Sequence, residues 1–228
     1  MILSKGLIVS CQAYQGDPLF GAQYMAAMAK AAEWGGAVGI RANSPQDIRA
    51  IRQVTSLPII GIYKISSASS EVYITPDINA ADQISQAGCD IIAIDATPRP
   101  RPNGVQLSEL ISHIKEKLGK PVMADISCLD DAITAEALKA DYISTTLSGY
   151  TAHGRPVIDG PDLELVAQLV QTVNLPVIAE GRIHEPAQAA QAIKLGAHAV
   201  VVGEAITRPE KITRHFITAM QEAVVRKN

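Results

Sequence analysis

The sequence predicts an α/β fold, a (β/α)8 or TIM barrel that forms a single domain over residues 1–228. Eight short apolar runs alternate with eight stretches of helical apolar spacing, and this alternation is typical of right-handed crossovers in a parallel sheet. Hydrophobic residues make up 47% of the chain and aromatic residues 4%, which favours strands buried on both faces. A repeat at half-chain spacing gives a third indication.

The predicted strands are short runs rich in Val and Ile, and most are bounded by Gly, Pro, Asn or Asp. They cover residues 6–12, 37–42, 58–64, 90–96, 121–127, 142–147, 176–182 and 199–206. Several of the predicted helices begin at Asp or Pro, as helix starts often do. They cover residues 21–34, 45–54, 77–87, 105–117, 130–139, 161–172, 186–195 and 209–225.

The repeat links the third and seventh units. "QVTSLPIIGIYK" from Gln53 aligns without a gap with "QTVNLPVIAEGR" from Gln171. Similarity at about half the chain length predicts two halves of four units each. An open doubly wound sheet is the alternative, but it requires a glycine-rich fingerprint after the first strand, which "CQAYQGDP" does not supply.

Composition limits the class of partner. The net charge of -3 provides no general field for nucleic acid. No leader-like segment opens the chain, and no apolar run is long enough to span a bilayer. Cys11, Cys89 and Cys128 lie far apart and each sits in or beside an apolar run, so we expect buried thiols in a reducing compartment. A soluble cytoplasmic protein without nucleic-acid or membrane partners is expected.

Six predicted strands end in polar side chains, which a barrel would bring to one mouth. Alternation places Lys64 on the same strand face as Ile62, and Glu180 on the same face as Ile178, so both are expected to point inward. For any single residue, a solvated strand end or a salt bridge at the barrel rim is an alternative. The six residues are Gln12, Arg41, Lys64, Asp95, Asp125 and Glu180.

The loops after the seventh and eighth strands predict a phosphate site. "EGRIHEP" contains Gly181 and Arg182, and "VVVGEAITRPE" contains Gly203 and Arg208. Backbone N–H groups at glycines, a helix terminus and guanidinium charge would together bind a phosphate there. A tight turn is the alternative for Gly203.

We expect no metal and no cofactor. The five histidines are scattered and none has a recognisable ligand spacing with carboxylates, and there is no phosphate-binding loop of the G-x-x-x-x-G-K-[ST] type. Proton abstraction next to a carbonyl, Schiff-base chemistry at Lys64, and loss of water from a sugar phosphate remain open.

At these positions the sequence resembles the N-acetylmannosamine-6-phosphate 2-epimerases, and the resemblance runs nearly end to end. "GAVGIRAN" at the second strand and "STTLSGYT" at the sixth, in that order, are its specific pieces, and "PIIGIYK", "ADIS" and "VIAEGRI" accompany them. The resemblance implies a barrel isomerase that interconverts N-acetylmannosamine 6-phosphate and N-acetylglucosamine 6-phosphate in sialic acid breakdown, with a sugar phosphate as its ligand.

The resemblance implies that Lys64 and Glu180 carry the proton transfers. Inversion at C2 removes the proton next to the aldehyde of the open-chain sugar and returns one to the opposite face, which requires a base and an acid across the carbon. The third and seventh strands are opposed in a ring of eight, so this pair satisfies the requirement. Which residue takes the proton from which epimer stays open.

Further residues are assigned by the same resemblance. It implies that Gln12 and Arg41 hold the acetamido and hydroxyl groups and that Asp125 positions Lys64. For Arg41 and Asp125, an ion pair at the rim is the alternative.

Two loops are expected near the mouth. The loop over residues 147–161 would cover the sugar, with Tyr150 or Thr151 reaching it, unless it is a plain surface loop. Prolines make residues 97–104 a stiff connection, neither helix nor central strand, in which Arg99 and Arg101 either attract the anion or are simply solvated.

Two other functions and the oligomeric state stay open. A Schiff-base aldolase or lyase would use Lys64 as a nucleophile, and a non-catalytic sensor would keep the pocket without turnover. The apolar helix predicted over residues 21–34 would pack either on the barrel or on a partner, so a homodimer is also open.

Overall fold

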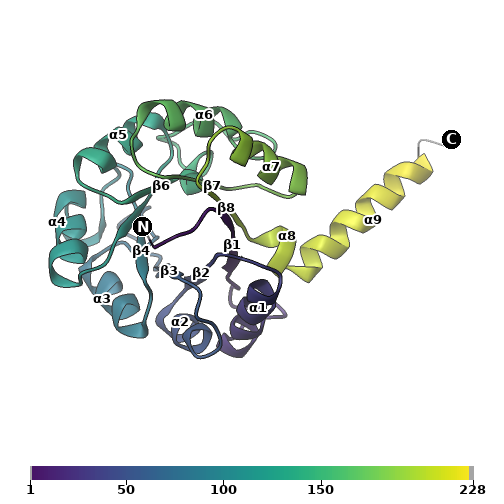
Figure 1. The fold of residues 1–228 in the computed structure, drawn as a ribbon, viewed down its shortest axis with the longest axis horizontal. Coiled ribbons are helices and arrows are strands. Elements are labelled where there is room, and N and C mark those ends of the chain that lie inside the picture. Colours follow the sequence, from purple (N-terminus) through teal and green to yellow (C-terminus); the bar gives the residue numbers. More distant parts are fainter. Residues whose placement is uncertain (1, 226–228) are drawn as a thin grey trace.

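The protein is a closed barrel of eight parallel strands, paired in the order β1 to β8 with β8 beside β1 (Figure 1). The computed structural model describes residues 2–225. The predicted fold class is confirmed. The strands are β1 (Gly6–Cys11), β2 (Gly39–Asn43), β3 (Ile59–Ile62), β4 (Ile91–Asp95), β5 (Val122–Asp125), β6 (Tyr142–Ser144), β7 (Val177–Glu180) and β8 (Ala199–Val202).

Alternation along the strands produces two apolar layers. Ile8, Ile60 and Ile178 belong to the inner cluster that fills the barrel, whereas Val9 and Ile59 belong to the outer cluster that packs under the helices. Successive side chains of a strand point to opposite faces, so a polar residue two positions beyond an inner apolar residue projects into the barrel mouth. Asp125 and Glu180 occupy such positions, after Met123 and Ile178, as predicted, and Arg41 is paired in register with Ile60 of the inner cluster.

A ring of helices covers most of the barrel. Their starts follow ordinary capping: Ser44 caps α2, with Pro45 as its first residue, and Asp77 accepts a hydrogen bond from Ala80 N at 2.8 Å at the start of α3. The helices are α1 (Ala22–Trp34), α2 (Pro45–Arg52), α3 (Ile78–Ala87), α4 (Leu107–Ser112), α5 (Leu129–Ala137), α6 (Leu163–Thr172), α7 (Pro186–Lys194), α8 (Glu204–Thr207) and α9 (Pro209–Val225). A π-helical turn, His113–Lys117, continues α4.

Several predicted boundaries differ from the observed ones, and the largest differences at strand ends occur in two strands. The run 142–147 leaves the sheet after Ser144 and continues as a 3₁₀ turn. The run 199–206 ends at Val202, and Gly203 then begins the short helix α8. In both, the predicted run continues past the last residue of the strand, so composition alone does not mark the end. The connection 97–104, predicted as neither helix nor central strand, contains a short 3₁₀ turn over Pro102–Gly104.

Helix α9 differs from the other helices because it points away from the barrel (Figure 1). Several of its apolar side chains are exposed, with 64% for Phe216 and 69% for Met220. Among residues 2–225, no helix combines the length and the apolar character that crossing a bilayer requires.

Candidate active site

A cavity of about 400 Å³ opens at the carboxyl ends of the strands, which is where barrel enzymes place their chemistry. Both predicted catalytic residues line it, as do most of the predicted ligand-binding residues. The predicted residues in its wall are Gln12, Arg41, Lys64, Tyr150, Glu180, Gly181, Arg182, Gly203 and Arg208. Asp125 and Thr151 are not in the wall.

Arg41 and Asp125 form a buried ion pair beneath the cavity. The side chains are 1% and 0% exposed, and the guanidinium donates from Nη1 to Oδ1 at 3.0 Å and from Nη2 to Oδ2 at 2.5 Å. Desolvation by burial would lower the pKa of Arg41, yet the Asp125 and Glu180 carboxylates raise it above its ordinary value. Arg41 is therefore a permanent, fixed cation in the cavity floor. The pair lies inside the barrel, not at its exposed rim.

Lys64 lies just beyond β3, and its ammonium group faces an aromatic ring. Lys64 Nζ donates to Tyr14 Oη at 2.9 Å and lies 5.1 Å from the ring centroid. Its backbone N–H donates to Asn43 Oδ1 at 2.8 Å. Asp125 was expected to position Lys64, but the hydrogen bonds found for its carboxylate within residues 2–225 come from Arg41 and Thr146.

Glu180 ends β7 on the opposite side of the ring from Lys64, and its side chain is 13% exposed. Its Oε2 lies 3.1 Å from Arg41 Nη1. Burial raises the pKa of Glu180 above its ordinary value, and the nearby Asp125 charge raises it further, although Arg41 and Lys64 act in the opposite direction. A carboxyl group with a raised pKa can hold and release a proton at a pH where most carboxyls are ionised.

Thr146 connects the two buried carboxyl groups. Its Oγ1 lies 2.7 Å from Asp125 Oδ1 and 3.1 Å from Glu180 Oε2. A hydroxyl carries one proton, so it can donate to one of the two carboxylates at a time. Ser144 Oγ lies 2.8 Å from the same hydroxyl and 3.3 Å from Glu180 Oε2. Thr146 can therefore donate to Glu180 only while it does not donate to Asp125.

Two residues of the cavity wall each have a buried polar atom without a hydrogen-bond partner within residues 2–225. The two atoms are Gln12 Oε1 and Arg41 Nε. Gln12 Nε2 is already engaged, since it donates to Ser10 Oγ at 2.7 Å. A buried polar atom without a hydrogen bond costs about 1–3 kcal/mol, so a ligand that supplies a donor to Gln12 and an acceptor to Arg41 would recover this cost.

The backbone at the β7 and β8 ends suits an anion. Gly181 has a φ of 107° and Arg182 a φ of 54°, so the chain turns sharply after β7. Gly203 caps the N-terminus of α8. First-turn N–H groups of a helix have no intrahelical partner and carry partial positive charge. The short helix after the eighth strand is the element with which barrels commonly bind phosphate.

Two guanidinium groups flank this backbone, and both are held in place. Arg182 donates from Nε to Gly160 O and from Nη1 to Ser148 O, both at 2.8 Å, and lies 5.0 Å from the Tyr150 ring centroid. Arg208 pairs with Asp17 at the start of the chain. Fixed cations beside these backbone N–H groups make this rim of the cavity suitable for an anion.

Some predicted residues lie elsewhere. Arg99 pairs with Asp95 at 2.6 Å, and Arg101 is buried and donates to Asp95 O, so neither is solvated nor part of the cavity wall. Thr151 Oγ1 accepts from Gly154 N at 3.1 Å and stabilises its own loop.

Sequence reasoning missed several residues of the cavity wall, among them Tyr14, Tyr73, Thr146 and His184. Tyr14 follows Gln12 by two residues, and this spacing from a residue predicted at the mouth could have indicated that Tyr14 also lies there. Tyr73 lies in a connection that showed no pattern.

Residues that could hold a metal lie outside the cavity wall. The group found within residues 2–225 consists of Cys128, Asp131 and His153. In this group His153 Nε2 lies 3.0 Å from Asp131 Oδ1, a contact that no ligand spacing in the sequence indicates. The expectation that all three thiols are buried was wrong for Cys128, which is partly exposed.

Comparison with known proteins gives a consistent result. A family model described as "Putative N-acetylmannosamine-6-phosphate epimerase" matches residues 25–222. A protein of Caldanaerobacter subterraneus subsp. tengcongensis, named "Putative N-acetylmannosamine-6-phosphate 2-epimerase", is 52% identical over 221 residues, covering 96% of this chain and 93% of the relative. A protein of the same name from Clostridioides difficile is 49% identical over 215 residues, covering 94% and 96%.

A solved structure agrees with the sequence relatives. The N-acetylmannosamine-6-phosphate 2-epimerase from Clostridium perfringens superposes with a TM-score of 0.92 at 46% sequence identity. The superposition covers 96% of this chain and 94% of that chain.

Proposed function

The chain belongs to the N-acetylmannosamine-6-phosphate epimerase family, and from this membership we propose that it is an isomerase acting on N-acetylmannosamine 6-phosphate. The product is N-acetylglucosamine 6-phosphate, formed by inversion at C2, and the reaction belongs to sialic acid breakdown. The carrying observation is that Lys64 and Glu180, from opposite sides of the ring, line one cavity together with residues of the loops after β7 and β8.

In the proposed reaction, one of these side chains removes the C2 proton and the other supplies a proton to the opposite face. The open-chain sugar has an aldehyde at C1, so loss of the C2 proton gives an enolate whose charge lies on O1. A fixed donor stabilises such developing charge. Arg41 is suited to this role because it is buried, permanently charged and held by Asp125.

The acetamido group gives the second point of recognition. Gln12 presents a buried acceptor without a partner within residues 2–225, and the amide N–H of the substrate is a matching donor. We assign the phosphate to the backbone after Gly181 and at the start of α8, beside Arg182 and Arg208. This places the two ends of the sugar on opposite sides of C2.

Proton NMR in heavy water tests the proposal directly. Purified protein mixed with N-acetylmannosamine 6-phosphate is expected to form N-acetylglucosamine 6-phosphate with deuterium at C2. A stable adduct at Lys64 after borohydride treatment with substrate would instead favour a Schiff-base aldolase or lyase. Binding without turnover of any N-acylhexosamine 6-phosphate would favour a sensor.

We also propose that the chain forms a homodimer through α9. A helix of 17 residues is about 26 Å long, and this one has Phe216, Ile217 and Met220 exposed outside the barrel. Exposed apolar stripes of this kind mark protein–protein contacts. Light scattering is expected to show a dimer that Met220→Glu dissociates and the control Thr218→Glu does not, and an unchanged mass for Met220→Glu would contradict the proposal.

The cytoplasm is the location we propose. Cys11, Cys89 and Cys128 are all unpaired, which suits a reducing compartment.

A further inference from the structure

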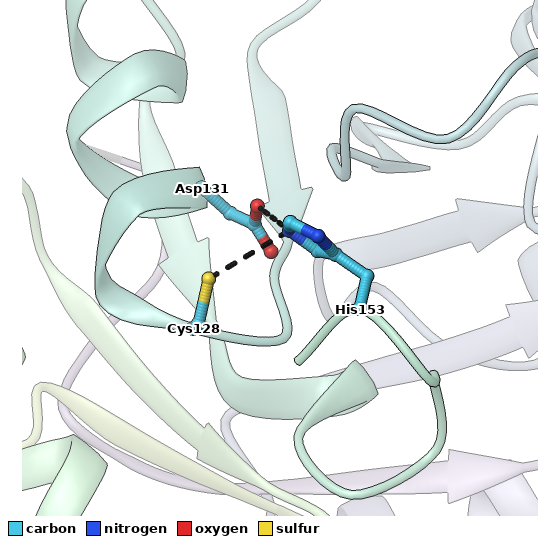
Figure 2. Close-up of side chains that lie close together, drawn as sticks. All are labelled: Cys128, Asp131 and His153. Atoms are coloured by element: carbon cyan, nitrogen blue, oxygen red, sulfur yellow. Dashed lines mark hydrogen bonds and ion pairs between the residues drawn. The ribbon is translucent and has the colours of Figure 1, made fainter. Parts of the chain in front are cut away.

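A thiol, a carboxylate and an imidazole meet at the start of α5 (Figure 2). Cys128 is the residue that caps α5, and Asp131 lies in its first turn. His153 reaches them from the loop between β6 and α6, residues 148–162. The reaction proposed above uses none of these three side chains.

The three ligand atoms are spaced as metal ligands are. His153 Nε2 lies 3.0 Å from Asp131 Oδ1 and 3.9 Å from Cys128 Sγ, and all three atoms lie within 4.8 Å of one another. Around a tetrahedral Zn²⁺ with ordinary bond lengths, N–O and N–S separations are about 3.3 and about 3.6 Å. The two separations that involve His153 therefore differ from these values by about 0.3 Å. We propose that Cys128, Asp131 and His153 bind Zn²⁺ through Sγ, Oδ1 and Nε2, with solvent as the fourth ligand.

The surrounding hydrogen bonds orient the carboxylate. Asp131 is 2% exposed at its side chain, and its Oδ2 accepts from Ser127 N at 2.9 Å and from Ser127 Oγ at 2.7 Å. Oδ1 is thereby left to face His153. Metal-binding carboxylates are commonly held by such outer contacts.

The position of the histidine depends on the neighbouring glycine. A Cβ atom on Gly154 would lie 2.5 Å from Ser127 Cβ, so no larger residue fits there without a shift of the chain. This close approach brings the loop against the β5–α5 turn and places His153 over Asp131. The side chain of His153 is 36% exposed, which leaves a path for an ion from solvent.

The ligand set selects the ion. A thiolate with an imidazole and a carboxylate suits Zn²⁺ or a similar transition metal, whereas Ca²⁺ and Mg²⁺ prefer oxygen ligands. Zn²⁺ with one thiolate and one carboxylate has no net charge, so the positive N-terminal end of α5 opposes it little. The Cys–His separation of 3.9 Å is longer than the contact expected of a thiol activated by its base, which argues against a nucleophilic role.

The bound ion would attach the loop to the barrel at its middle. Arg182 already holds the same loop at Ser148 O and Gly160 O, and Tyr150 of this loop lines the cavity. A third attachment at His153 would restrict the segment that covers the sugar site. The effect on substrate binding rests on the proposed function, whereas the ion binding does not.

Spectroscopy with Co²⁺ and calorimetry with Zn²⁺ test the site on the full chain after removal of metal by chelation. We expect one ion per chain and, with Co²⁺, a thiolate-to-cobalt charge-transfer band. Cys128→Ser should abolish this band, and Cys128→Ser and His153→Ala should each weaken Zn²⁺ binding by at least about tenfold. His113→Ala is the matched control, because His113 Nε2 pairs with Asp82 Oδ1 at 2.7 Å without a thiol nearby.

Loop protection gives a second readout. Zn²⁺ should slow proteolysis within residues 148–162 of the parent chain but not of Cys128→Ser. Zn²⁺ binding by Cys128→Ser with the affinity of the parent chain, or equal losses of affinity in Cys128→Ser and His113→Ala, would overturn the proposal. Zn²⁺ binding of the expected kind in a protein without epimerase activity would leave this site standing and reject the proposed function alone.

Discussion

Arg41 Nη1 lies 3.1 Å from Glu180 Oε2 while the same guanidinium holds Asp125 with both terminal nitrogens. One buried cation therefore serves two carboxyl groups in the floor of the cavity. This arrangement has measurable consequences for activity, for stability and for their pH dependence.

Removing the acid–base function of Glu180 should abolish turnover without loss of the fold. For Glu180→Gln we expect kcat to fall by about 10²–10⁴, the usual contribution of a positioned proton-transfer group. Glu204→Gln is the matched control, because Glu204 lines the same cavity but is exposed. Equal losses of kcat in the two variants would contradict a special role for Glu180.

Breaking the buried ion pair of Arg41 and Asp125 should lower the stability of the protein strongly. Asp125→Asn leaves the Arg41 charge uncompensated by its main partner, so the free energy of unfolding should fall by about 3 kcal/mol or more. Asp141→Asn is the comparison, since Asp141 pairs with Lys115 at 2.7 Å but both side chains are about one third exposed. Asp141→Asn should lower the free energy of unfolding by less than about 1 kcal/mol. Urea unfolding at neutral pH measures both, and a similar small loss in both variants would refute the prediction.

Thr146 should tune the pH dependence of the reaction. The hydrogen bond from Thr146 lowers the pKa of Glu180, so Thr146→Val is expected to raise that pKa further and move the acidic limb of kcat/KM to higher pH. Thr146→Ser retains the hydroxyl and should restore the parent profile. The pH profiles of the three proteins provide the test. An acidic limb that is identical in all three would show that Thr146 does not act through Glu180.

The partly buried carboxyl group of Asp47 should make the stability of the protein depend on pH. Burial raises the pKa of Asp47 from 3.8 to about 6 in the folded protein. Between these two values the folded chain binds more protons than the unfolded chain, so stability falls as the pH rises through this window. The side chain is only partly buried, so we expect Asp47→Asn to be about 1 kcal/mol more stable than the parent at pH about 7.5 and to lose that advantage near pH about 4.

Urea unfolding at the two pH values tests this expectation. The exposed Asp159 provides a control variant, Asp159→Asn, that should show no such difference. A stability difference between Asp47→Asn and the parent that does not change with pH would contradict the assignment.

The barrel and much of the cavity wall were predictable from sequence because they follow from local pattern. The positions of Lys64 and Glu180 follow from alternation with Ile62 and Ile178, and Gly203 follows from its place at a strand end. To predict each of these positions, only the two-residue period of a strand and the order of the strands in a closed ring are needed.

Contacts that depend on side-chain reach across the barrel were not predictable in this way. The sequence left open whether Asp125 meets Arg41 or positions Lys64, since β2, β3 and β5 all end at the same mouth. Cys128 and His153 are 25 residues apart, and they meet because Gly154 packs against Ser127. The packing of Gly154 against Ser127 depends on the folded conformation of the loop, and no periodic pattern in the sequence indicates it.

Deuterium exchange at C2, measured separately from each epimer, tests the central claim most directly. Lys64 and Glu180 are expected to serve opposite faces of C2, so Lys64→Met and Glu180→Gln should each lose exchange from at least one epimer, while Glu204→Gln exchanges like the parent. Exchange from both epimers at the parent rate in Lys64→Met or in Glu180→Gln would show that the proton transfers occur without that residue.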